Sequence, residues 1–79
     1  MKYSPEDEVV IDNRNLLILA SVNYAGKEYI YAQEIDEEND DLLLNYFVYE
    51  AGEPDKLVTD ESLRNVLLEM FIKELKKEM

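Results

Sequence analysis

The chain has 79 residues, among them no cysteine and no histidine, and 19 acidic residues against eight basic ones give a net charge of −11 at pH 7. This length fits one small domain, and the missing residue types exclude disulfides, thiolate zinc sites and the usual nucleophile–base pairs of hydrolytic enzymes. The negative charge opposes direct binding to nucleic acid or to an anionic membrane surface, and no apolar run reaches the roughly 18 residues of a membrane span.

The N-terminal residues 1–8 are polar, carry acids and contain Pro5, so we expect a flexible start to the chain. They also lack the apolar core of a signal peptide, which predicts a cytoplasmic protein. Five stretches rich in branched and aromatic residues follow and are typical of strands: 9–12, 16–24, 27–35, 42–50 and, as a brief edge strand, 57–58. Short polar or glycine-containing segments separate them, which indicates hairpin connections between consecutive strands.

The strongest local signal is the hairpin around Ala25 and Gly26, where Gly26 supplies a positive φ. A two-residue turn places Val22 opposite Tyr29. A three-residue loop with a bulge at Gly26 places Val22 opposite Glu28 instead. The sequence leaves both registers open.

From about Asp60 to Lys77 the apolar residues repeat with the period of a helix. One face carries Leu63, Val66, Leu67, Met70, Phe71 and Leu75. Thr59 or Asp60 is placed to cap the N-terminus of this helix. Strands first and one helix last predict an α+β fold, in which an antiparallel meander of three to five strands packs one face on a C-terminal helix. We expect one domain over 1–79, with the meander at 9–58 and the helix at 60–77.

The stretch "ILASVNYAGKEYIYAQEIDEE" at 18–38 resembles the signature hairpin of the YrzB-like family of small, acidic, uncharacterised bacterial proteins. The matching positions are Tyr24, Gly26, Lys27, Glu28 and Tyr29, and the "D-E-x-L" that opens the family's closing helix matches Asp60, Glu61 and Leu63. This chain departs from the family at "IDNRN", where members have a glycine-bearing hairpin. The resemblance implies an α+β fold and a bacterial, cytoplasmic setting, and it supplies no activity.

The acidic run after this hairpin consists of Glu34, Asp36, Glu37, Glu38, Asp40 and Asp41. Hard cations such as calcium bind several carboxylates, but the run lacks the D-x-D-x-D-G spacing of a calcium loop. We therefore interpret 36–41 as a solvated connection that keeps the domain soluble, with weak cation binding as the alternative.

The strands are apolar on both faces. Strand 16–24 places Leu16, Ile18, Ala20 and Val22 on one face and Leu17 and Leu19 on the other, and strand 42–50 places Leu42, Leu44, Tyr46 and Val48 opposite Leu43, Phe47 and Tyr49. A single helix covers one face of such a sheet, so either the sheet coils until both faces are partly covered, or the second face meets a partner. The predicted contacts of that partner are Leu17, Leu19, Phe47 and Tyr49, or their opposite-face counterparts.

Without histidine or cysteine we expect no enzyme activity, no catalytic residues, no cofactor and no dedicated metal site. The first functional hypothesis is a protein-interaction module, either a homodimer or an adaptor for another cytoplasmic protein. The alternative is an acidic mimic of nucleic acid that occupies a basic protein, because residues 1–61 alone carry 16 acids and four bases.

Overall fold

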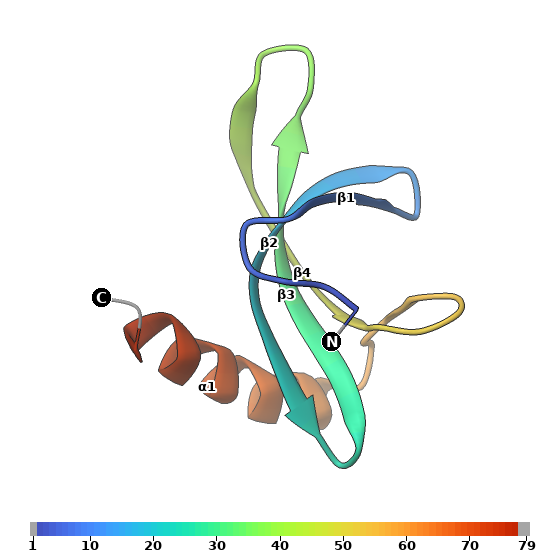
Figure 1. Cartoon of the computed structure of the whole chain (residues 1–79), viewed down its shortest axis with the longest axis vertical. Coiled ribbons are helices and arrows are strands. Elements are labelled where there is room, and N and C mark those ends of the chain that lie inside the picture. Colours follow the sequence, from blue (N-terminus) through green and yellow to red (C-terminus); the bar gives the residue numbers. More distant parts are fainter. Residues whose placement is uncertain (1, 78–79) are drawn as a thin grey trace.

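The computed structural model describes residues 2–77 and contains five strands and one helix, which confirms the predicted α+β fold (Figure 1). The strands are β1 (Glu8–Ile11), β2 (Arg14–Tyr24), β3 (Lys27–Asp36), β4 (Asp41–Glu50) and β5 (Lys56–Leu57), and the helix is α1 (Glu61–Lys77). The strands form one antiparallel sheet in the order β1-β2-β3-β4-β5, a meander. No helix within residues 2–77 is long and apolar enough to cross a membrane.

Two tight turns fix the pairing of the first three strands. Ala25 and Gly26 have φ of 51° and 78°, and Val22 lies opposite Tyr29, so the hairpin adopts the two-residue alternative. Asp12 and Asn13 connect β1 to β2 in the same way, with φ of 53° and 62°. Paired positive φ values define the type I′ turn, whose twist matches that of the flanking strands.

A bulge at Leu19 divides β2 into two halves whose buried side chains point to opposite faces of the sheet. Ile18 pairs with Ala32, but Ala20 pairs with Tyr31, so the register shifts between them. Because neighbouring residues of β3 point to opposite faces, Ile18 and Ala20 do so too. The expectation that Leu16, Ile18, Ala20 and Val22 share one face is therefore wrong.

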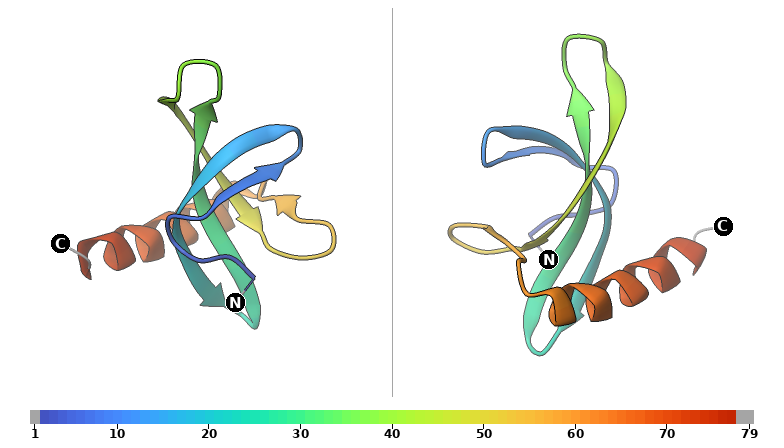
Figure 2. Two further views of the ribbon diagram at one scale, coloured as in Figure 1. Left: turned by 45° about the horizontal axis from the view of Figure 1, so that its top comes forward. Right: turned by 180° about the vertical axis from the view of Figure 1, so that it is seen from behind.

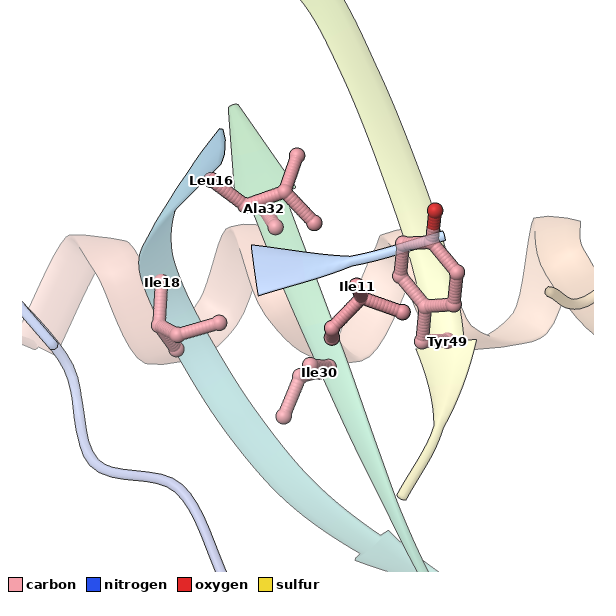
Figure 3. Close-up of a cluster of buried hydrophobic side chains, with 6 residues drawn as sticks. All are labelled: Ile11, Leu16, Ile18, Ile30, Ala32 and Tyr49. Atoms are coloured by element: carbon pink, nitrogen blue, oxygen red, sulfur yellow. The ribbon is translucent and has the colours of Figure 1, made fainter. Parts of the chain in front are cut away.

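The sheet coils so that each face has its own core. On one face, the strand-side cluster consists of Ile11, Leu16, Ile18, Ile30, Ala32 and Tyr49 (Figure 3). On the other, the helix-side cluster consists of Ala20, Val22, Tyr29, Val48, Leu67 and Phe71. The helix covers the second face, while the N-terminal segment lies on the side away from it (Figure 2). Of the two alternatives, partial coverage of both faces by coiling is the one that the structure shows.

Helix α1 begins where Asp60 caps it. The Leu63 N–H donates to Asp60 Oδ1 over 3.1 Å, so the cap is Asp60 rather than Thr59. Glu61 in the first turn and Lys76 and Lys77 in the last complement the helix dipole. Leu67 and Phe71 are its two fully buried side chains within Glu61–Lys77.

The start of the chain makes hydrogen bonds to the sheet. Glu6 and Asp7 bond to the edge of β2: the Glu6 N–H donates to the Ile18 carbonyl over 2.7 Å, and the Ile18 N–H donates to the Asp7 carbonyl over 2.9 Å. Glu28 accepts the backbone N–H groups of Lys2 and Tyr3 at 2.6 and 3.0 Å. The flexibility expected for 1–8 stays a prediction; Glu8 belongs to β1, and Met1 lies outside the described part of the chain.

Candidate functional site

The structure does not bring the four predicted contact residues together on one exposed surface. Leu17 lies opposite Gln33 on the helix-side face, whereas Phe47 and Tyr49 lie opposite Ala32 and Ile30 on the strand-side face. Leu17, Leu19 and Phe47 are half-buried, and Tyr49 is fully buried. Tyr49 is therefore a core residue and offers no surface to a partner.

Arg14 accounts for the cover over this part of the strand-side face. Its guanidinium lies 4.6 Å from the centroid of the Phe47 ring, and its Nη1 donates to the Tyr49 hydroxyl over 3.3 Å. Burial raises the pKa of Tyr49, and Arg14 offsets part of that rise. Both aromatic residues thus have partners inside the molecule.

The opposite-face counterparts on β4 are exposed instead. Leu42, Leu44 and Tyr46 are 53%, 85% and 40% exposed, which makes them an apolar row along one strand. A register irregularity explains the most exposed member: Gln33 lies opposite Tyr46, yet Ile35 lies opposite Leu42, so β4 has two extra residues here. Such a bulge bends a strand and aims a side chain away from the core. The run Leu42–Leu44 is the sequence signal for this row, because three consecutive leucines in a strand cannot all face one core.

The outer edge of β4 is open along the same residues. Strand β5 pairs only with Tyr49 and Glu50, and the next contact is a bond of 2.9 Å from the Val58 N–H to the Val48 carbonyl. Beyond Val48 no strand within residues 2–77 pairs with this edge. Because backbone groups alternate in direction along a strand, the N–H and carbonyl of Tyr46 point to the same open side as those of Val48.

A groove of about 700 Å³ lies between this edge and the N-terminal half of α1. Its lining comes from β4, from the end of β5 and the chain after it, and from one stripe of the helix: Tyr46, Phe47, Val48, Leu57, Val58, Thr59, Glu61, Arg64, Asn65 and Leu68. Leu57 is 41% exposed and so adds to the apolar surface here. The groove thus joins an unpaired strand edge to a wall that carries both apolar and polar side chains.

Stacked aromatic rings support Tyr46, the exposed aromatic residue of this groove. The Tyr46 ring stacks on Tyr31 with centroids 5.6 Å apart, and Tyr31 stacks on the fully buried Phe71 at 5.4 Å. Burial raises the pKa of Tyr31, Tyr46 raises it further, and Arg64 opposes both. Tyr46 is thus an exposed ring on a rigid support, as are many aromatic residues at binding interfaces.

The acidic run predicted to be a loop forms the tip of the β3–β4 hairpin, which extends away from the rest of the sheet (Figure 1). Asp36 has a local role, since it accepts the Asn39 side-chain amide at 2.8 Å and the Glu38 N–H at 3.1 Å. The Asn39 bond is the main reason that the pKa of Asp36 is lowered. Within residues 2–77 no three acidic side chains are grouped so that they could hold a metal ion, and none of the ion pairs found there involves residues 36–41.

Comparison of the chain with protein-family models, with curated proteins and with solved structures finds no match in any of the three.

Proposed function

We propose that this protein is a non-enzymatic, cytoplasmic protein-interaction module that pairs with a second copy of itself or serves as an adaptor for another protein. The observation that carries the proposal is the open edge of β4, where Leu42, Leu44 and Tyr46 are exposed and Tyr46 also lines the groove. The resemblance to the YrzB-like family supports the bacterial, cytoplasmic setting and adds nothing on activity.

An open edge with exposed apolar side chains favours association for two reasons. Its unpaired N–H and carbonyl groups are a template for another strand, and soluble proteins usually blunt such edges with charge or proline. Residues 42–44 carry leucines there instead. Exposed apolar patches beside polar residues are in turn typical of protein interaction sites.

The test compares wild type with Leu44→Lys and with the control Val10→Lys. Val10 is also an exposed apolar strand residue, at 67%, but it lies on β1 and outside the groove. Light scattering over a concentration series measures self-association, and affinity capture from the cells that make the protein measures association with others. We expect Leu44→Lys to abolish whichever association occurs and Val10→Lys to preserve it. A monomeric wild type that captures nothing in a Leu44-dependent way would contradict the proposal.

A second candidate is an acidic mimic of nucleic acid. The observation that favours it is that residues 28–55 carry ten acids and no base. Raising the salt concentration from about 50 mM to about 500 mM separates the two functions. Binding as a mimic should weaken steeply over that range, whereas binding through the apolar edge should persist.

A further inference from the structure

We propose that the open edge of β4 accepts an extended segment of a partner protein as an additional strand, and that this segment combines apolar residues with lysine or arginine. The inference rests on the proposed function and names both the mode of binding and the chemistry of the partner. It follows from the backbone at the edge, the groove beside it and the charge at its end.

The backbone provides an unoccupied strand position. The line of β5 ends where the Val58 N–H meets the Val48 carbonyl, and there the chain turns away toward α1. Residues 41–47 of β4 continue along that line without a partner strand among residues 2–77. A segment of about six residues, roughly 20 Å long, would fill the vacant line and pair with the outward N–H and carbonyl of Tyr46.

The groove selects the side chains of that segment. Every second side chain of an added strand would face the helix side, where Tyr46, Val58 and Leu68 are among the apolar residues of the lining. Glu61 and Arg64 stand on the helical wall and give the groove a polar rim. In strand addition the main chain supplies affinity, and pockets for alternate side chains supply specificity, so the segment needs apolar residues at every second position.

Charge identifies the occupant as a basic partner rather than a second copy. The open edge leads to the hairpin tip, where Asp36, Glu37, Glu38, Asp40 and Asp41 lack any ion pair within residues 2–77. A second copy would bring another net charge of −11, and its own β4 edge lies in a stretch without a single base. Lysine or arginine at the tip-proximal end of an incoming strand would instead meet complementary charge.

The experiment uses a phage-displayed library of random ten-residue peptides, selected against the immobilised 79-residue chain. We expect enrichment of peptides with alternating apolar residues and at least two lysines or arginines. Amide hydrogen exchange with and without an enriched peptide then reports on the edge. The Tyr46 N–H should exchange fast in the free protein and become protected at least about tenfold in the complex, because strand addition gives it a hydrogen-bond partner.

Two pairs of variants separate the backbone and charge contributions. Tyr46→Pro removes the outward N–H at an edge position that tolerates proline, while Tyr46→Val removes the ring and keeps the N–H. We expect Tyr46→Pro to weaken peptide binding well beyond Tyr46→Val, by about tenfold or more. Glu37→Gln with Glu38→Gln should weaken it about two- to fivefold, whereas the control Glu6→Gln with Glu69→Gln, which removes the same charge elsewhere, should change it little.

The outcomes distinguish this inference from the proposed function. Enriched peptides that leave the exchange of the Tyr46 N–H unchanged would overturn strand addition, and neutral or acidic peptides would overturn the basic partner; both results leave an interaction module standing. Failure to enrich any peptide also overturns strand addition, and Leu44-dependent self-association would replace the partner by a second copy. If Tyr46→Pro does not fold, the exchange measurement on wild type decides alone. Only a chain without Leu44-dependent association of any kind would remove the module as well.

Discussion

The Tyr3 hydroxyl donates a hydrogen bond of 2.5 Å to the Asp55 carboxylate and so ties the start of the chain to the loop between β4 and β5. Asp55 also accepts the Gly52 N–H at 2.8 Å and the Lys2 ammonium at 3.1 Å, and its side chain is only 12% exposed. Partial burial raises the pKa of Asp55, but these three donors together lower it below the ordinary value. The ionised carboxylate is thus the form that the fold prefers.

Asp55→Asn should therefore destabilise the protein in a pH-dependent way. A carboxyl whose pKa is lowered on folding stabilises the folded state above its unfolded pKa of about 3.9, and this contribution is lost as the pH falls through the folded pKa. We expect wild type to exceed Asp55→Asn by about 1–3 kcal/mol in free energy of unfolding at pH 7 and the difference to shrink below about pH 4. Urea denaturation of both proteins at a series of pH values measures this difference in free energy of unfolding. A difference independent of pH would show that the charge of Asp55 is irrelevant.

The turn at Ala25 offers a stabilising substitution. Ala25 has φ of 51°, a conformation that costs residues with a Cβ about 1 kcal/mol and that asparagine tolerates best. Ala25→Asn creates the Asn-Gly pair favoured in type I′ turns and should raise the free energy of unfolding by about 0.5–1 kcal/mol.

Gly26→Ala, at the other residue of the same turn, should destabilise the protein. Gly26 has φ of 78°, and nothing lies within 4 Å of the Cβ that alanine would add. A decrease of about 1 kcal/mol in the free energy of unfolding would therefore come from the backbone alone. Thermal denaturation of both variants tests the turn type. A loose, open turn would leave both melting temperatures unchanged.

The elements of the fold were predictable because each has a local signal. The strands alternate apolar residues between turn-forming pairs, and α1 repeats them every three to four residues, so the predicted bounds agree with the structure to within two residues. The bulge at Leu19 has no such signal, since it arises from the need of a coiled sheet to bury one strand on both faces. The bond between Tyr3 and Asp55 joins residues 52 positions apart and is likewise invisible locally.

The exposed surface was predictable only in part. A strand that is apolar on both faces indicates that some apolar side chains stay outside the core, but the pattern cannot say which. Phe47 and Tyr49 are covered from within the molecule by Arg14. This residue lies opposite Ile11 at the start of β2, and from there its side chain contacts both residues. Leu44 stays exposed because the extra residues of β4 carry it away from the sheet.

Phe71→Ala should be among the most damaging single changes in the helix. Phe71 is fully buried and stacks on Tyr31, and truncation of such a ring typically costs about 3–5 kcal/mol. A domain of this length has a total stability of roughly 4–12 kcal/mol, so the variant should be marginal or unfolded at 37 °C. Ile72→Ala, at a neighbouring residue that is 51% exposed, is the control and should cost less than about 1 kcal/mol. Equal costs for the two would place the helix in a different rotation about its axis.

Alkaline pH should destabilise the fold through its tyrosines. Burial is the main cause that raises the pKa of Tyr3, Tyr31 and Tyr49. A group whose pKa is raised on folding contributes its full stability below the unfolded pKa, here about 10, and loses it as the pH rises through the folded value. We expect the free energy of unfolding to fall above about pH 10, and to fall less in Tyr49→Phe. Ultraviolet absorbance of the phenolate, followed together with circular dichroism, should show one part of the ionisation that coincides with unfolding, and this part should be smaller in Tyr49→Phe.

Salt should stabilise the protein, because like charges crowd the sheet. The ten acids of residues 28–55 face only a few cations from elsewhere, such as Lys27, whose ammonium lies 3.2 Å from Glu50. Repulsion among exposed charges is screened at a Debye length of about 8 Å near physiological ionic strength. We expect the melting temperature to rise between about 10 mM and about 150 mM NaCl, and to rise less in Glu37→Gln with Glu38→Gln, which already removes part of the repulsion. Lys27→Gln should respond more strongly than wild type, since it leaves Glu50 uncompensated. Stability that falls with salt would mean that the attractive pairs of this fold outweigh the repulsion, and the charge at the hairpin tip would then no longer argue for a basic partner.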